Sequence, residues 1–219
     1  MAAWDIVIVG GGSAGCVLAN RLSADPARRV LLLEAGRDLP PGHEPDAILD
    51  MYPGRAAFDP ANHWPGLTAH LQPGGHNDPD RPPRVAYEQA RILGGGSSIN
   101  GQVANRGVPA DYDEWVALGA HGWSWAAVLP YFIKLERDLD QGGPLHGKAG
   151  PITIHRVPER LWPPYSHAAK AALLAMGHPD IEDQNGRFED GCFAMTIAND
   201  GRHRVSAARG YLDAATRAR

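Results

Sequence analysis

The stretch IVIVGGGSAG at residues 6–15 decides the fold that we expect for this chain. Its first four residues are wholly apolar, as in a parallel strand that is buried on both faces. The glycines have the spacing G-x-G-x-x-G, and from Ser13 onward the apolar residues recur at helical spacing. A second apolar run, VLLL at residues 30–33, ends at Glu34. Strand, glycine turn, helix and strand in this order predict a βαβ unit over residues 1–36.

The first glycine turn, residues 10–15, is typical of sites that hold a dinucleotide. Gly10 would permit the tight turn, Gly12 would let a pyrophosphate approach the backbone, and Gly15 would allow close packing of helix on strand. The amide groups of Ser13 and Ala14 would face the anion at the positive end of the helix. A purely structural glycine-rich turn is the alternative interpretation of these residues.

Glu34 lies 19 residues after Gly15, at the end of the second expected strand. A carboxylate at this position can accept hydrogen bonds from the hydroxyl groups of an adenosine ribose, and it would repel a 2′-phosphate. This motif alone does not distinguish FAD from NAD. A nicotinamide-dependent dehydrogenase therefore remains an alternative at this point.

A second group of small residues occurs in ARILGGGSSING at residues 90–101. Within it, residues 94–98 form the second glycine turn of the chain. Small residues in series indicate that a backbone must come very close to another group. Consecutive glycine and serine amide groups can also form an anion-binding nest. A glycine-rich hinge would be the structural alternative if this segment stood alone.

The segment at residues 90–101 resembles the first signature of the glucose–methanol–choline (GMC) oxidoreductase family, and the resemblance spans essentially the whole chain. Besides the βαβ unit, it is carried by NRG at 105–107, DYDEW at 111–115, VLPYF at 128–132 and SAARGYL at 206–212. Within the family, the chain is similar to the hydroxymethylfurfural oxidase branch, near the aryl-alcohol oxidases and choline dehydrogenases. That similarity is carried by NHWP at 62–65, YFIKLER at 131–137 and DQNGRF at 183–188.

The resemblance implies that the cofactor is FAD and that it is bound non-covalently. Ile99 stands where some family members tether the flavin through a histidine, and it has no nucleophilic atom. Trp64 lies in a Pro/Gly-rich loop, so local packing is as good an explanation for it as a cofactor contact. The residues implied to hold FAD are Gly10, Gly12, Ser13, Ala14, Gly15, Glu34, Ala35, Trp64, Leu93, Gly94, Gly95, Ser98, Asn100, Gly101 and Val103.

The activity implied by the resemblance is oxidation of a primary alcohol to an aldehyde, with hydride transfer to flavin N5 and reoxidation by oxygen or another acceptor. Family members are far longer, and their C-terminal part supplies the catalytic histidine. None of the ten histidines of this chain falls in that motif, so we predict no catalytic residue here. A non-catalytic flavin-binding fragment, or a split-protein half with a C-terminal companion chain, is therefore an alternative. No His, Cys and Glu residues stand at metal-ligand spacing, so no metal is expected.

The fold class expected is α/β. We expect a Rossmann-like FAD-binding domain with a three-layer ββα architecture, followed by the beginning of an α+β substrate domain, and we expect the chain to be truncated at its C-terminus. Missing later strands would expose apolar faces, so we expect poor solubility or weak FAD binding. The FAD domain would cover residues 1–110, with a loop or lid at 37–90 and the flavin signature at 90–108. The substrate domain would begin in residues 111–200, and residues 201–219 would return to the FAD domain. Expected elements are helices at 109–118, 124–139 and 164–176, a strand at 152–155 and a last element at 205–212, with Pro130 delaying or kinking the second helix.

Composition limits the other function classes. The net charge is −4 with no basic stripe, which argues against nucleic acid as a partner. No apolar run approaches the roughly 18 to 20 residues that a membrane span needs. The two cysteines, Cys16 and Cys192, are far apart in sequence, which favours two unrelated thiols and a cytoplasmic location.

Overall fold

The computed structural model describes residues 3–71 and 82–219, and its contacts divide the chain into two compact units. Unit 1 comprises Met1–Gly101 and Ser206–Arg219, and unit 2 comprises Gln102–Val205. The domain boundaries expected from sequence lie after residues 110 and 200, so the first boundary is earlier and the second slightly later than expected. Part of the loop or lid expected at 37–90 lies outside the described residues.

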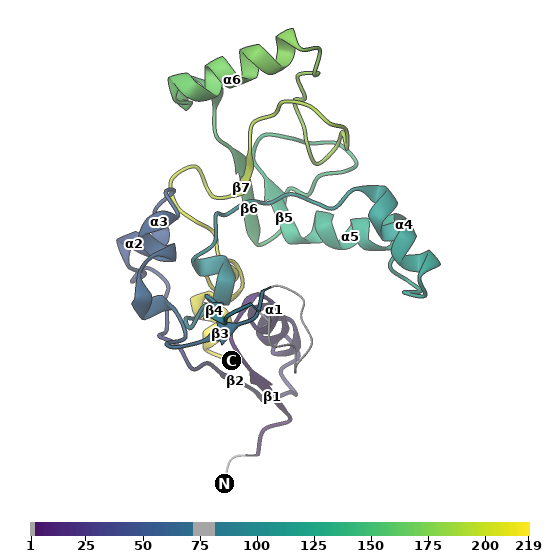
Figure 1. Ribbon diagram of the computed structural model, residues 1–219. Helices are drawn as coiled ribbons and strands as arrows, with labels where there is room; N and C mark the ends of the chain where they lie inside the picture. Colours follow the sequence, from purple (N-terminus) through teal and green to yellow (C-terminus); the bar gives the residue numbers. More distant parts are fainter. Residues whose placement is uncertain (1–2, 72–81) are drawn as a thin grey trace. The chain divides into compact units, whose positions relative to one another are not determined.

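Unit 1 contains the βαβ unit that the sequence predicts (Figure 1). Strand β1 (Ile6–Val9) pairs in parallel with β2 (Val30–Leu33), and helix α1 (Ser13–Leu22) connects them. Ile6 lies opposite Val30 and Val9 opposite Leu33. Helix α1 begins directly after Gly12, so the first glycine turn fills the whole connection from β1 to the helix.

The strands of this sheet are not buried on both faces, and this expectation was wrong. Ile8 is 8% exposed, whereas Val7 is 52% and Val9 is 83% exposed. Gly15 of α1 lies against Ile8, since a Cβ at Gly15 would be 3.6 Å from the Ile8 Cγ2. Because successive side chains of a strand point to opposite faces, α1 covers Ile8 and leaves Val7 and Val9 uncovered. Within the described part of the chain, β1 and β2 form a two-stranded sheet with α1 on one side, and its other apolar face is exposed at Val7 and Val9.

The described residues in the remainder of unit 1 form little extended regular structure. Its elements are short: α2 (Asp46–Leu49), α3 (Gly54–Ala57), the 3-10 helices η1 (Pro60–Asn62) and η2 (Gly95–Ser98), the paired strands β3 (Thr68–Ala69) and β4 (Val85–Ala86), α7 (Ala207–Tyr211) and α8 (Ala214–Arg217). Residues 206–219 return to unit 1, whereas residues 201–205 remain in unit 2.

Unit 2 is built on a mixed sheet. Strand β6 (Ile152–Arg156) lies between β5 (Glu136–Asp138), which is parallel to it, and β7 (Thr196–Ala198), which is antiparallel. Its helices are α4 (Pro109–Ala117), α5 (Trp125–Leu135), the 3-10 helix η3 (Glu159–Leu161) and α6 (Pro164–Ala175). The helices expected at 109–118 and 164–176 and the strand expected at 152–155 are thereby confirmed. Among the described residues, no helix has both the length and the apolar character that crossing a membrane requires.

The helix expected at 124–139 is only partly correct. Helix α5 ends at Leu135, and the next three residues form β5. In this strand Glu136 and Asp138 point into the interior of unit 2, where they pair with the buried side chains of Arg106 and Arg156. Pro130 does not delay the start of the helix, because the Ser124 side chain caps it by accepting a hydrogen bond from the Ala127 amide.

The interior of unit 2 holds two guanidinium–carboxylate pairs. Arg106 Nη2 lies 2.7 Å from Glu136 Oε1, and Arg156 Nη1 donates to both oxygens of Asp138 at 2.6 and 2.8 Å. All four side chains are at most 7% exposed. Burial of a charge is tolerated only when it is paired and hydrogen-bonded, so each of these groups depends on its partner in the folded unit.

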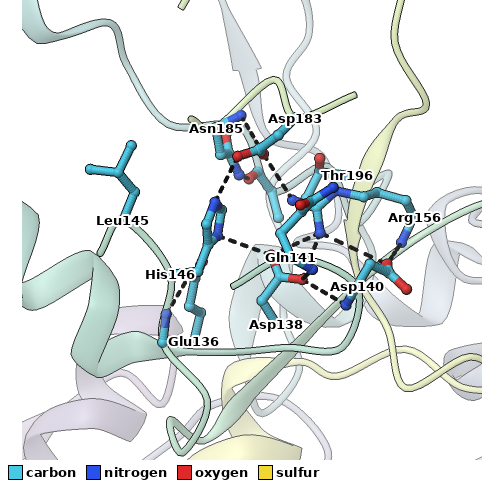
Figure 2. A network of polar contacts seen from close by, with 12 residues as sticks. Glu136, Asp138, Asp140, Gln141, Leu145, His146, Arg156, Asp183, Asn185 and Thr196 are labelled. Atoms are coloured by element: carbon cyan, nitrogen blue, oxygen red, sulfur yellow. Dashed lines mark hydrogen bonds and ion pairs between the residues drawn. The ribbon is translucent and has the colours of Figure 1, made fainter. Parts of the chain in front are cut away.

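His146 joins the two pairs (Figure 2). Its Nδ1 lies 3.1 Å from Glu136 Oε1 and 3.2 Å from Asp138 Oδ2, while its Nε2 lies 2.8 Å from Asp183 Oδ2. Carboxylate oxygens accept hydrogen bonds, so both ring nitrogens have acceptors in reach. His146 thereby connects the β5 strand to the loop that carries Asp183.

Substitutions on the two faces of β1 should have unequal costs. Ile8→Ala should lower the free energy of unfolding by about 2–5 kcal/mol, because it leaves a cavity under α1. Val9→Ala should cost less than about 1 kcal/mol, the range of strand propensity alone. Urea denaturation of both variants measures the difference. Equal losses would show that Val9 is covered in solution.

Acidification should weaken unit 2 through Asp138. Burial opposes ionisation of this carboxyl, but hydrogen bonds from Arg156 and from the amides of Gln141 and Asp140 outweigh it and hold the pKa of Asp138 below its usual value. The resulting stabilisation is complete above the ordinary carboxyl pKa of about 4 and is lost as the pH falls through the lower folded-state pKa. Asp138→Asn should cost about 3 kcal/mol at pH 7 and flatten this acid dependence. Urea midpoints at several pH values measure both effects, and an unchanged acid slope would contradict the assignment.

Candidate functional site

The two glycine turns, separate in sequence, lie in direct contact in unit 1. The Gly94 amide donates a hydrogen bond to the Gly11 carbonyl at 2.6 Å. A Cβ on Gly95 would lie only 2.8 Å from the Gly12 Cα, and Gly95 has a φ of +55°. The close approach that the small residues predicted is therefore an approach of the two turns to each other.

The first glycine turn has one closed side and one open side. A Cβ at Gly15 would overlap the Gly10 carbonyl oxygen, so Gly15 serves the packing of helix on strand. A Cβ at Gly12 would meet nothing nearer than the Gly95 Cα at 4.0 Å. Helix α1 starts at this open side, without a side-chain cap, and Ser13 and Ala14 are exposed there. Open space before an uncapped helix N-terminus suits a phosphate group.

Glu34 ties the end of β2 to the first glycine turn. Its Oε2 accepts a hydrogen bond from the Gly11 amide and its Oε1 accepts one from the Gly36 amide, both at 2.7 Å. Each carboxylate oxygen has a second lone pair, so the group retains capacity for ribose hydroxyls. The sequence indicated the ribose role, which stays a prediction, but it gave no sign of the two contacts to backbone amides.

Ala35 and Trp64 are linked by one arginine. The Arg91 Nε donates to the Ala35 carbonyl at 3.1 Å, and its guanidinium carbon lies 5.0 Å from the centre of a Trp64 ring. Trp64 is 45% exposed, and its amide donates to Gln89 at 3.0 Å. The structure thus links Trp64 to Ala35 only through Arg91, and both interpretations of Trp64 stay open.

In the second glycine turn, not all of the residues predicted to contact FAD have side chains that a ligand could reach. Ser98 is fully buried, and its hydroxyl donates to the Leu93 carbonyl at 2.7 Å, so only its backbone is available to a ligand. Asn100 and Gly101 are exposed at the end of unit 1. Val103 is 48% exposed but belongs to unit 2, so the structure does not group it with the other predicted residues.

Cys16 is a buried neighbour of the first turn. Its Sγ lies 3.2 Å from the Gly11 carbonyl oxygen, and burial raises the pKa of the Cys16 thiol to about 11. The thiol is therefore protonated at neutral pH and behaves as a small apolar group. Cys16 supplies no nucleophile to this site.

Unit 2 contains a group of side chains that could hold a metal ion, although no such grouping was expected from sequence spacing. One ligand atom each from Glu136, Asp138 and His146 lie within 4.8 Å of one another. The carboxylates, however, already pair with the guanidinium groups of Arg106 and Arg156. Because these cations fill the place of a counter-ion, we assign no metal to the group.

Two close approaches in unit 1 escaped the sequence reasoning. A Cβ on Gly36 would overlap the backbone at Arg91 and Ile92, so Gly36 lets the segment after β2 meet the segment before the second glycine turn. Ser97 connects that turn to the C-terminal segment through the Ala207 amide. The serine-rich sequence was a visible signal, but it gave no indication of which serine would face which partner.

Comparison with known proteins gives consistent results. Residues 4–218 match the family described as GMC oxidoreductase. The 5-(hydroxymethyl)furfural oxidase of Methylovorus sp. (strain MP688) is 56% identical over 220 residues, which cover 99% of this chain and 41% of that protein.

Two solved structures are similar over nearly the whole chain. Pyridoxine 4-oxidase from Mesorbium loti has a TM-score of 0.80 and 34% identity, covering 99% of this chain and 41% of that one. An FAD-dependent oxidoreductase from Chaetomium thermophilum has a TM-score of 0.79 and 35% identity, covering 95% and 36%. The chain thus spans about two fifths of the length of these proteins. With its α/β fold and its two glycine turns in contact, the chain belongs to the GMC oxidoreductase family.

Proposed function

We propose that this chain forms the Rossmann-like FAD-binding part of an enzyme that oxidises primary alcohols to aldehydes. The observation that carries the proposal is the open side of the first glycine turn. There, α1 starts without a side-chain cap, and a Cβ at Gly12 would meet nothing nearer than the Gly95 Cα at 4.0 Å. Backbone amides and a helix N-terminus are the groups that a pyrophosphate requires.

The chain's own residues would hold FAD in the following way. The amides of Ser13 and Ala14 at the start of α1 would bind the pyrophosphate. Glu34, already fixed by two amides, would accept hydrogen bonds from the adenosine ribose. When bound, FAD would supply the acceptor for the hydride of the alcohol. Relatives named as oxidases and as an FAD-dependent oxidoreductase favour this cofactor over NAD.

Non-covalent binding is part of the proposal. Ile99 is 8% exposed and apolar, so the position where some family members carry a tethering histidine has no reactive atom. Cys16, the nearby thiol, is held protonated by burial. At neutral pH, therefore, neither side chain offers the flavin a nucleophile.

We further propose that turnover needs residues beyond this sequence, from a longer form of the polypeptide or from a companion chain. The relatives are more than twice as long as the matched region. The uncovered face of the β1–β2 sheet, with Val7, Val9 and Leu33 about half or more exposed, supports the proposal because further layers could cover it. The alternative is a fragment that binds FAD without any catalytic role. Both cysteines are free, which agrees with a cytoplasmic location as the proposed one.

Gly12→Ala tests the site without disturbing the fold. The new Cβ has no close neighbour and Gly12 has a φ of −75°, which alanine adopts readily, so the unfolding midpoint should not change. The methyl group would occupy the space proposed for the pyrophosphate, and FAD affinity should fall at least about tenfold, the loss expected when close backbone contact is blocked. Titration with FAD, followed by flavin fluorescence, measures the affinity.

The matched control is Gly142→Ala in unit 2, where the nearest atom to the new Cβ is the Lys148 Cε at 3.7 Å. It should leave both stability and FAD affinity unchanged. If Gly12→Ala bound FAD as tightly as this control, the pyrophosphate would lie elsewhere and the proposed site would be wrong.

Denaturation distinguishes the mode of flavin attachment. FAD that co-purifies with the chain should pass entirely into the filtrate after unfolding in guanidinium and ultrafiltration, because neither Ile99 nor Cys16 offers a nucleophile to it. The absorbance spectrum of retentate and filtrate measures this. Flavin bands that stay with the unfolded protein would contradict non-covalent binding.

A further inference from the structure

The second glycine turn is connected to the C-terminal segment of the chain through the hydroxyl group of Ser97. Its Oγ donates to the Gly94 carbonyl at 2.6 Å and accepts from the Ala207 amide at 2.9 Å. One hydroxyl thus uses its single donor on the Gly94 backbone and one acceptor site on the backbone of Ala207, which lies 110 residues after Ser97. Ala207 is the first residue of α7.

Helix α7 packs directly behind the second glycine turn. A Cβ on Gly94 would lie 3.1 Å from the Ala208 Cβ, and Gly94 has a φ of +87°. Ala207 and Ala208 are 6% and 3% exposed. Gly94 in turn holds the first glycine turn through its hydrogen bond to Gly11. Contacts therefore run without interruption from α7 through Gly94 to the proposed pyrophosphate space.

The rest of the C-terminal segment fixes α7 in place. The Asn20 side chain on α1 donates to the Tyr211 carbonyl at 2.8 Å. Arg217 donates to both oxygens of Asp38 at 2.9 and 2.8 Å and to the Leu39 carbonyl at 3.1 Å. Asn20 lies in α1, and Asp38 follows β2. The C-terminal segment is therefore attached to the same βαβ unit that carries the first glycine turn.

We propose that Ser97 is a positioning residue of the FAD site. Its hydroxyl holds the Gly94–Gly95 backbone against the first glycine turn, beside the space proposed for the pyrophosphate, although Ser97 need not touch the cofactor. The proposal rests on the proposed function. It assigns to the segment at 206–212 a role in cofactor binding that acts through Ser97.

The test compares Ser97→Ala with Ser97→Thr in the full chain. Ser97→Ala removes both hydrogen bonds, so FAD affinity should fall on the order of tenfold, the effect of roughly one net hydrogen bond. The visible circular dichroism of the bound flavin should change as well, because the turn no longer holds one position. Ser97→Thr retains the hydroxyl and should restore both the affinity and the spectrum. Ser166→Ala in α6 of unit 2 is the control and should change neither.

A second variant covers the case in which Ser97→Ala does not fold. Ala207→Pro removes the amide that donates to Ser97 and places the ring Cδ where its hydrogen pointed, so the Ser97 hydroxyl is displaced from α7. Proline suits the first position of a helix after an extended residue such as Ser206, with φ −73° and ψ 168°. It should weaken FAD binding as Ser97→Ala does, and the two changes combined should cost less than the sum of their separate effects.

Wild-type affinity and an unchanged flavin spectrum in Ser97→Ala or, where that variant does not fold, in Ala207→Pro would overturn the proposal. So would equal losses in Ser97→Ala and Ser97→Thr, since the hydroxyl would then not be the relevant group. These outcomes are distinct from failure of the proposed function itself, in which the wild-type chain binds no FAD or Gly12→Ala has no effect.

Discussion

The structure of unit 1 depends on the hydrogen bond between the Gly94 amide and the Gly11 carbonyl. This bond brings together two turns that are remote in sequence, and neither turn could approach so closely with a side chain at Gly95. Everything else in the proposed site is arranged around the contact. Glu34 fixes Gly11 from the end of β2, and α7 supports Gly94 from behind. The space before α1 is thereby defined by backbone atoms, which thermal motion displaces less than long side chains.

The sequence predicted those parts of the fold that follow from local pattern. The apolar runs and the glycine spacing identified the bounds of β1 and β2 and the start of α1, because strand and helix periodicities differ clearly there. It failed at β5, because helical spacing continues through Glu136 and Asp138 while their buried guanidinium partners are supplied by distant residues. The uncovered face of Val7 and Val9 was also missed, since an apolar strand does not reveal how many layers accompany it.

The candidate site was predictable in its residue types and not in its contacts. Motif spacing indicates which glycines lack space for a side chain, but not whether the neighbour is a cofactor or a second turn. Ser98 illustrates the limit, since its hydroxyl is used internally by Leu93 while the adjacent Ser97 reaches α7. Val103 illustrates another, because a residue two positions beyond Gly101 belongs to a different compact unit. Long-range geometry of this kind follows from packing, which a single sequence does not encode locally.

Unit 2 is one continuous stretch of chain, whereas unit 1 is completed by residues 206–219. During synthesis, unit 2 therefore emerges from the ribosome whole, before the contacts behind Gly94 can exist. Until Ala207 and Ala208 are synthesised, the second glycine turn lacks the helix that packs against Gly94 and bonds to Ser97. Assembly of the site therefore follows the synthesis of unit 2, and its timing is set by the order in which the polypeptide is made.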